Sequence, residues 1–110
     1  MPDVSWLNQS VVLITGASTG IGAALAKQLA QRYPSIRLVL AARNQTKLEA
    51  VGQTCRETGA EVLIVPTDLA QVEQAQALAQ QALDQFGQVD VLINNAGYGQ
   101  MGPLELMTPA

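Results

Sequence analysis

The 110-residue chain contains no histidine and a single cysteine, Cys55. Without histidine, the side chain that most often serves as general base or metal ligand is unavailable. One cysteine excludes an intrachain disulfide and a thiolate zinc cluster. The chain has six basic and nine acidic residues, which give a net charge of −3 and a pI of about 4.6. A broad basic surface for nucleic acid or anionic lipid is therefore not expected.

Long hydrophobic runs are also absent. No segment approaches the roughly 18 consecutive apolar residues of a membrane span. The first residues, MPDVSW, lack the basic and apolar regions of a signal peptide. Hydrophobic residues still make up 48% of the chain and charged residues 14%, which is enough apolar material for a packed core. The composition predicts a protein of the reducing cytoplasm with no membrane and no nucleic-acid partner.

Short apolar segments alternate with amphipathic ones along the chain. Strands are predicted over residues 11–14, 36–41, 61–65 and 89–93. Helices are predicted from residue 21 to Pro34, from Asn44 to Gly59, and over residues 71–86. Strands that alternate with helices in a βαβαβαβ order favour an α/β fold with a Rossmann-type, doubly wound parallel sheet. The expected strand order is 3-2-1-4.

The helix ends carry recognisable signals. Pro34 closes the first helix, Asn44 suits the N-cap of the second, Gly59 suits its C′ position, and Gly87 ends the third. The predicted inward faces are Ile21, Leu25, Gln28 and Leu29 in the first helix, Leu48, Val51 and Cys55 in the second, and Val72, Ala75, Leu78, Ala79, Ala82 and Phe86 in the third. Cys55 is accordingly interpreted as a small core residue rather than a reactive thiol.

The last residues predict an element that the sequence does not complete. Thr108 and Pro109 form a helix-start signal one residue before the final Ala110. The fourth strand would also lie at an unfinished sheet edge. We therefore expect residues 1–110 to be the N-terminal part of a single dinucleotide-binding domain that is incomplete at its C-terminus.

Three glycines, Gly16, Gly20 and Gly22, lie between the first predicted strand and the first predicted helix. Gly16 permits a tight turn, Gly20 lets a pyrophosphate approach the backbone, and Gly22 allows the helix to pack closely on the strand. The GxxxGxG spacing differs from the GxGxxG fingerprint, and no GK[ST] of a P-loop follows. The alternative is an ordinary strand-to-helix turn with incidental glycines.

Three motifs in this order resemble the short-chain dehydrogenase/reductase family. TGASTGIG at residues 15–22 resembles its TGxxxGIG cofactor motif, and NNAG at residues 94–97 resembles its NNAG motif. Asp68, just past the third predicted strand, matches the aspartate that contacts adenine in the family. The resemblance covers the N-terminal half of the family's domain. It implies an NAD(P)-dependent oxidoreductase that interconverts a carbonyl and an alcohol by hydride transfer.

The same resemblance assigns roles to individual residues. It implies that the backbone around Ser18, Thr19, Gly20 and Ile21 holds the phosphates. Asp68 would accept a hydrogen bond from the adenine amino group, with the backbone N–H of Leu69 nearby. The implied cofactor-binding set is Gly16, Ser18, Thr19, Gly20, Ile21, Gly22, Arg43, Asp68, Leu69, Asn95, Ala96 and Gly97.

Asn95, Ala96 and Gly97 would border the cofactor ribose, whereas Asn94 would mainly tie the fourth strand to the first turn. Two alternatives stay open at this point. Asp68 could be a capping carboxylate near the start of the third helix. Asn94 and Asn95 could be purely structural turn residues.

The end of the second strand bears on the choice of cofactor. An NAD-selective site usually places an acidic residue there to bond the ribose 2′-OH. This strand instead ends Leu40-Ala41-Ala42-Arg43. No carboxylate repels a 2′-phosphate, and a guanidinium can hold phosphate with two parallel hydrogen bonds. The sequence predicts NADP (NADPH) rather than NAD, with a solvated surface arginine as the alternative reading of Arg43.

The family's proton-transfer residues do not occur in this sequence. They are a serine and a YxxxK pair, but Tyr33 and Tyr98 are followed four residues later by Arg37 and Gly102. Reduction of a carbonyl needs a positioned acid that protonates the developing alkoxide. We therefore assign no catalytic residue and no metal ligand, and we expect the chain to be inactive alone.

The full-length protein is expected to act on a small-molecule carbonyl or alcohol and to form a homo-oligomer. The competing hypothesis is a dinucleotide-binding protein without catalysis, such as a redox sensor or scaffold. A third reading is that the short chain is itself a binding module. A continuation with the serine and YxxxK would distinguish the enzyme from the other two.

Overall fold

Four parallel strands form the centre of the computed structural model, which describes residues 5–95. They are β1 (Val11–Thr15), β2 (Arg37–Ala42), β3 (Glu61–Pro66) and β4 (Val91–Asn94). Their order across the sheet is β3-β2-β1-β4. This order confirms the prediction from the sequence, and it places the carboxyl ends of all four strands at one edge of the sheet.

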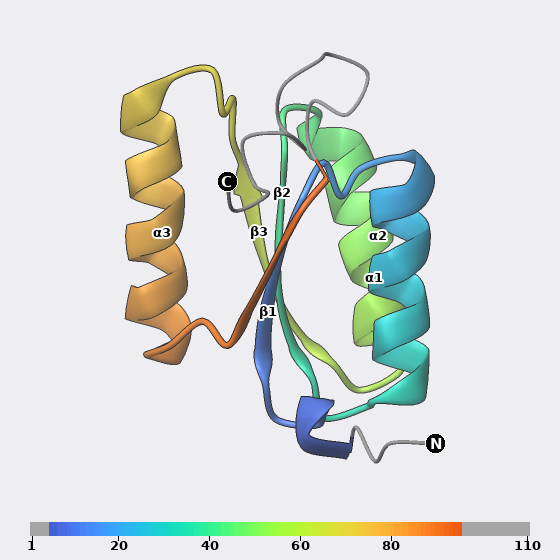
Figure 1. The fold of residues 1–110 in the computed structure, drawn as a ribbon. Helices are drawn as coiled ribbons and strands as arrows, with labels where there is room; N and C mark the ends of the chain where they lie inside the picture. The colour runs from blue at the N-terminus through green and yellow to red at the C-terminus, as the bar shows by residue number, and fades with distance from the viewer. Residues whose placement is uncertain (1–4, 96–110) are drawn as a thin grey trace, which may run out of the picture.

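Helices cover both faces of the sheet (Figure 1). α1 (Gly20–Arg32) and α2 (Gln45–Arg56) lie side by side on one face, and α3 (Val72–Phe86) lies on the other. A short 3₁₀ turn, η1 (Ser5–Leu7), precedes β1. The doubly wound α/β architecture is confirmed. Within residues 5–95, none of the helices has the length and apolar character needed to cross a membrane.

The strands are buried because each face has its own core. Alternate residues of β1 point to opposite sides: Val12 and Ile14 pack under α1 and α2, whereas Val11 and Leu13 pack toward α3. All five residues of β1 are buried, which explains why its sequence is a continuous apolar run. Cys55 lies in the α1–α2 core with no exposed surface. Burial raises the pKa of its thiol, so the interpretation of Cys55 as a core residue is confirmed.

The predicted inward face of α1 is wrong. The buried residues are Gly22, Ala23, Ala26 and Ala30, while Ile21 is 73% exposed and Gln28 is exposed as well. Leu25 and Leu29 are only partly buried. The reason is steric: a face of glycine and alanine lets the helix axis approach the sheet closely, and the larger side chains then flank the contact.

The second helix follows the prediction at its start and deviates at its end. The side chain of Asn44 caps α2 by accepting a hydrogen bond of 3.0 Å from the N–H of Lys47. Gly59 has the expected positive φ of +106°, but it lies at C″, because Glu57 is the C-cap. Thr58 explains the shift, since its N–H and hydroxyl both bond the carbonyl of Cys55 and extend the last turn by one residue.

The remaining corrections concern α3 and β4. Ala75, Leu78, Ala82 and Phe86 of α3 are buried or half-buried as predicted, but Val72 and Ala79 are exposed. Gly87 ends α3 in the left-handed conformation, as expected. β4 begins at Val91 rather than at residue 89. The helix expected at Thr108 and Pro109 lies outside the described residues.

Asp90 explains where β4 begins. Its carboxylate accepts a 2.7 Å hydrogen bond from the N–H of Val11 and a 2.9 Å bond from the side chain of Gln88. Its own N–H donates to the carbonyl of Val11 at 2.8 Å. The side chain of Asp90 therefore joins β1 and β4 at the position before the regular pairing of these two strands starts. The hydrogen bond from Val11 and that from Gln88 hold the pKa of Asp90 below its usual range, with a smaller contribution from the charge of Arg37.

We expect Asp90→Asn to reduce the free energy of unfolding in a pH-dependent way. Because the pKa of Asp90 is lowered in the folded state, its contribution is complete above the unfolded-state pKa of about 3.9 and is lost as the pH falls below that value. Denaturation followed by circular dichroism should show a difference between wild type and variant at neutral pH that shrinks toward pH ~3. Asp84→Asn on α3 is the control for loss of one exposed carboxylate. A difference that does not change with pH would contradict the role given to the Asp90 charge.

Candidate functional site

The glycine turn between β1 and α1 has the geometry that its sequence predicts. Gly16 and Gly20 adopt φ values of +63° and +59°, in the left-handed region that side chains disfavour. A Cβ at Gly22 would overlap the carbonyl oxygen of Gly16 and lie 2.7 Å from the Nδ2 atom of Asn95. A Cβ at Gly20 would meet no atom within 4 Å. The turn is thus packed tightly at Gly22, whereas the space beside Gly20 is open.

The first turn of α1 keeps its backbone donors available. Its N-cap residue, Thr19, makes no side-chain capping hydrogen bond, and the first turn contains no acidic residue. Unsatisfied N–H groups and the helix dipole attract an anion at such a helix start. The open space at Gly20 lies at this same position. Local geometry therefore suits a phosphate group, with Ser18, Thr19, Gly20 and Ile21 as the surrounding residues.

Two asparagines join β4 to this turn. The hydroxyl of Thr15 donates a 2.9 Å hydrogen bond to Oδ1 of Asn94 and accepts one of 2.9 Å from the N–H of Asn95. The Nδ2 atom of Asn95 donates to the carbonyl of Gly16 at 3.2 Å. Asn94 therefore ties β4 to the end of β1, and Asn95 makes the direct bond to the turn. The sequence reading gave Thr15 no role, although it begins the TGASTGIG motif and connects both asparagines.

Arg43 and Asp68 follow neighbouring strands at the same edge of the sheet. Arg43 comes directly after β2, is exposed, and has no hydrogen-bond or salt-bridge partner among residues 5–95. The N–H of Ala17 bonds the carbonyl of Ala41 at 3.1 Å, which links the glycine turn to the end of β2. The N–H of Thr67 bonds the carbonyl of Ala42 at 2.8 Å, which links the Asp68 loop to the same strand.

The carboxylate of Asp68 has a local structural contact as well. Its Oδ1 atom accepts a 3.0 Å hydrogen bond from the N–H of Ala70, and its own N–H donates to the side chain of Gln74 at 2.7 Å. Asp68 thus shapes the loop before α3, whose N-cap is Gln71. The other carboxylate oxygen has no partner within the described part of the chain. Leu69 packs partly against the core on the α3 side.

The predicted site residues are therefore brought to one edge, with two exceptions. Gly16, Ser18, Thr19, Gly20, Ile21 and Gly22 form the turn, and Arg43, Asp68, Leu69 and Asn95 follow the ends of β2, β3 and β4. Ala96 and Gly97 lie outside the described residues. Among the residues that the structure does describe, no group of side chains could hold a metal ion.

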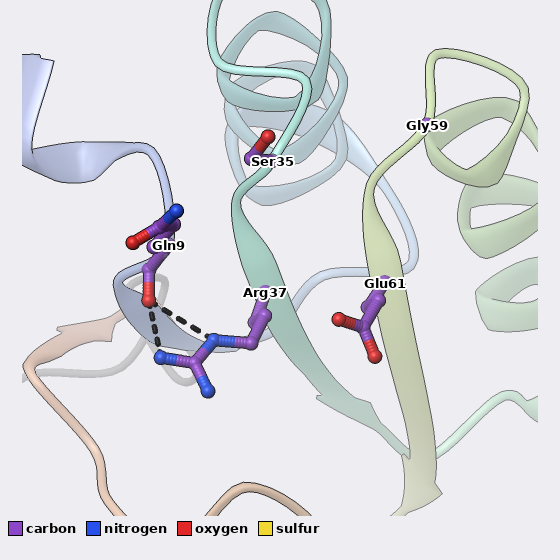
Figure 2. Close-up of a pocket in the computed structure, with 5 residues that line it drawn as sticks. All are labelled: Gln9, Ser35, Arg37, Gly59 and Glu61. Carbon is purple, nitrogen blue, oxygen red and sulfur yellow. Dashed lines mark hydrogen bonds between the residues drawn. The ribbon is translucent and has the colours of Figure 1, made fainter.

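A groove lies at the opposite edge of the sheet, where the strands begin (Figure 2). It is an open groove of about 430 Å³, lined by Gln9, Ser35, Arg37, Gly59 and Glu61. The guanidinium of Arg37 in this groove has a structural role, because its Nε and Nη2 atoms both donate hydrogen bonds to the carbonyl of Gln9. The guanidinium also lies 5.8 Å from the centre of the Phe86 ring, within the range of a cation–π contact. Arg37 thus fastens the segment before β1 to the end of α3.

A parallel sheet in the order β3-β2-β1-β4, with a glycine turn leading into an uncapped helix, defines a Rossmann-type dinucleotide-binding fold. The chain belongs to the short-chain dehydrogenase family, whose model, described as "short chain dehydrogenase", matches residues 10–110. The family resemblance inferred from the motifs is thereby confirmed. The chain corresponds to the N-terminal, dinucleotide-binding region of this oxidoreductase family.

Curated relatives are considerably longer than this chain. The 11-beta-hydroxysteroid dehydrogenase-like 2 protein of Arabidopsis thaliana is 43% identical over 91 residues, which cover 82% of this chain and 29% of the relative. An uncharacterised oxidoreductase of Methylorubrum extorquens is 37% identical over 105 residues, which cover 96% of this chain and 42% of the relative. The chain thus spans less than half the length of these proteins.

Solved structures agree with the fold. A metagenomic short-chain oxidoreductase in complex with NADP has a TM-score of 0.77 and 41% identity, covering 94% of this chain and 46% of that protein. An NAD+-bound xylitol dehydrogenase has a TM-score of 0.78 and 34% identity, covering 84% of this chain and 35% of that protein. Structural neighbours therefore bind either dinucleotide, and a nicotinamide dinucleotide is the typical cofactor of these relatives.

Proposed function

We propose that this chain forms the NADP(H)-binding part of an oxidoreductase that interconverts a small-molecule carbonyl and an alcohol. The observation that carries the proposal is the uncapped start of α1 beside the open space at Gly20. Unsatisfied backbone N–H groups and a helix dipole without a competing carboxylate favour the pyrophosphate there. When bound, the nicotinamide would supply or accept the hydride.

The choice of NADP(H) depends on Arg43. This guanidinium follows β2, is exposed, and has no partner within residues 5–95. β2 ends in Ala41 and Ala42, so no acidic side chain at the strand end repels a 2′-phosphate. Arginine binds phosphate with planar, charge-assisted hydrogen bonds. The metagenomic oxidoreductase is similar to this chain and binds NADP, and the xylitol dehydrogenase is similar to it and binds NAD+. Similarity therefore supports a nicotinamide dinucleotide, and the choice between the two is argued from Arg43 alone.

Other residues complete the proposed cofactor site. The unpartnered oxygen of Asp68 would accept a hydrogen bond from the adenine amino group, with the N–H of Leu69 nearby. Asn95 would hold the turn through its bond to Gly16 and, with Ala96 and Gly97, border the ribose. An unpaired, buried Cys55 supports a reducing compartment such as the cytoplasm as the site of action.

Titration of the chain with NADP+ and NAD+ tests the cofactor assignment. Charged hydrogen bonds contribute about 1.5–3 kcal/mol, so Arg43→Gln should weaken NADP+ binding by roughly 10- to 150-fold. Binding of NAD+, which lacks the 2′-phosphate, should change little. Arg32→Gln removes an exposed charge from the last turn of α1 and serves as the matched control. Equal loss with both variants, or tighter binding of NAD+ by the wild-type chain, would refute the assignment.

A further inference from the structure

The loop from β3 to α3 uses most of its backbone N–H groups in its own structure. This β3–α3 loop, residues 67–71, crosses from the carboxyl end of β3 to the start of α3 (Figure 1). Three of its N–H groups have backbone or carboxylate partners: Thr67 donates to the carbonyl of Ala42 at 2.8 Å, Ala70 to Oδ1 of Asp68 at 3.0 Å, and Gln71 to the carbonyl of Asp68 at 3.0 Å. The N–H groups of Asp68 and Leu69 are left, and their use decides what the loop offers to a ligand.

The N–H of Asp68 is satisfied from α3. It donates a 2.7 Å hydrogen bond to Oε1 of Gln74, six residues further along the chain. Gln74 is the third residue of α3, after the N-cap Gln71. A glutamine at this position reaches back to the backbone N–H of the N-cap in a capping box. Here the N–H of Gln71 is already bonded within the loop, so the side chain of Gln74 reaches past it and fastens Asp68 to the helix.

Leu69 is then the free backbone donor of the loop. Its N–H makes no hydrogen bond within residues 5–95, and one carboxylate oxygen of Asp68 is free there as well. Two adjacent residues therefore offer one acceptor and one donor, and every other N–H of the loop is occupied. Adenine carries the complementary pair on one edge, an exocyclic amino donor beside a ring-nitrogen acceptor. In hypoxanthine, a carbonyl oxygen and a ring N–H reverse this pair.

We propose that Gln74 is a positioning residue that makes the β3–α3 loop selective for adenine over hypoxanthine. Gln74 holds the N–H of Asp68, so the free carboxylate oxygen and the N–H of Leu69 are presented together. It also occupies the N–H that would otherwise be available to a carbonyl oxygen on the base. The inference rests on the proposed function, in which Asp68 and Leu69 receive the adenine of the cofactor.

A role of Gln74 in helix stability alone predicts a different result. A side chain that only stabilises the start of α3 would, when removed, weaken the binding of every base at this loop by the same factor. A side chain that determines which donors and acceptors are free changes the ratio of the affinities for two bases. Selectivity depends on polar groups that the wrong base leaves unpaired. The ratio of the two dissociation constants is therefore the quantity to measure.

Titration of the chain with NADP+ and with its hypoxanthine analogue tests the proposal. The wild-type chain should bind NADP+ about 5- to 150-fold more tightly than the analogue. Gln74→Met keeps the length and helix propensity of the side chain but removes the acceptor, and it should lower this ratio by about 2- to 10-fold. Gln74→Glu keeps an acceptor oxygen and should retain the wild-type ratio. Gln76→Met replaces an exposed glutamine of the same helix and serves as the matched control.

Hydrogen exchange at the backbone N–H of Asp68 provides a second readout that requires no ligand. This N–H should be protected in the wild-type chain and in Gln74→Glu, and it should exchange faster in Gln74→Met. Circular dichroism of each variant establishes that the helices are retained. Fast exchange of this N–H in the wild-type chain would overturn the contact on which the proposal depends.

The binding outcomes separate the role of Gln74 from the cofactor assignment. A ratio that Gln74→Met lowers, and that Gln74→Glu and Gln76→Met leave unchanged, supports the proposal. A wild-type preference for NADP+ that survives Gln74→Met, or an equal loss for both dinucleotides, would refute the role of Gln74 and leave the adenine site intact. Equal binding of the two dinucleotides by the wild-type chain, or binding of neither, would refute the adenine site itself and the inference with it.

Discussion

No hydride transfer is expected from residues 1–110 as an isolated chain, with either nicotinamide cofactor and any carbonyl or alcohol substrate. A positioned acid that protonates the alkoxide contributes about 10²–10⁴-fold to the rate of such reactions. The sequence contains neither a YxxxK pair nor a histidine that could take its place. Loss of groups that orient the reactants adds a further large factor. The change in absorbance of the reduced nicotinamide over hours measures this directly.

The same chain should self-associate or pack loosely in solution. Leu92 is 56% and Leu83 46% exposed on one side of the sheet, and β4 pairs only with β1 among residues 5–95. An exposed strand edge beside an apolar surface favours association. Light scattering should show a mass that increases with concentration. A monomer that unfolds cooperatively and reduces a carbonyl would contradict both the expected association and the expected inactivity.

The sequence was sufficient to predict the sheet because its strands are buried on both faces. Segments such as VVLI and RLVLAA have no polar alternation, and this pattern is typical of parallel strands between two helical layers. The glycine turn was equally predictable, since positive φ values at Gly16 and Gly20 require glycine. In both cases the local chemistry allows few alternatives.

Predictions failed where the tertiary contact depends on shape rather than on hydrophobicity. α1 buries Ala23, Ala26 and Ala30 instead of Ile21, because the close approach of helix and sheet selects for small side chains. β4 begins at Val91 because the side chain of Asp90 bonds the N–H of Val11, a contact between residues far apart in sequence. The spacing of apolar residues along the sequence predicts neither the close approach of α1 to the sheet nor the hydrogen bond from Val11 to Asp90.

The residues of the candidate site were proposed one by one from the sequence, but the hydrogen bonds that connect them were not. Asn95 was expected at the ribose, and the structure shows in addition that its Nδ2 atom holds the carbonyl of Gly16. Asp68 was expected at the adenine, and the structure shows in addition that one of its carboxylate oxygens accepts a hydrogen bond from the N–H of Ala70. These hydrogen bonds depend on the relative placement of loops from different strands. The cofactor roles of Arg43, Asp68 and Asn95 remain predictions that binding measurements test.

Gly22→Ala should be the most damaging methyl addition within the turn. The new Cβ would lie 2.7 Å from Nδ2 of Asn95 and 2.9 Å from the carbonyl carbon of Gly16. Gly16 cannot yield easily, because it is held in a left-handed turn and the next residue bonds the carbonyl of Ala41. Overpacking of this kind costs about 1–3 kcal/mol. Chemical denaturation followed by circular dichroism measures the loss, which should exceed that of any other single methyl addition to α1.

Two other glycines separate steric overlap from the general cost of replacing glycine. Gly52→Ala in α2 would place its Cβ 2.6 Å from Cδ1 of Ile64, the movable end of a side chain, and its effect should be small because alanine favours the helix by roughly 1 kcal/mol. Gly20→Ala meets no atom but requires φ near +59°, so its cost of about 1–2 kcal/mol is conformational.

Gly22→Ala should also break the 3.2 Å bond from Asn95 to Gly16, which shifts the turn and weakens dinucleotide binding. Wild-type stability and binding in Gly22→Ala would show that the turn does not depend on this close approach.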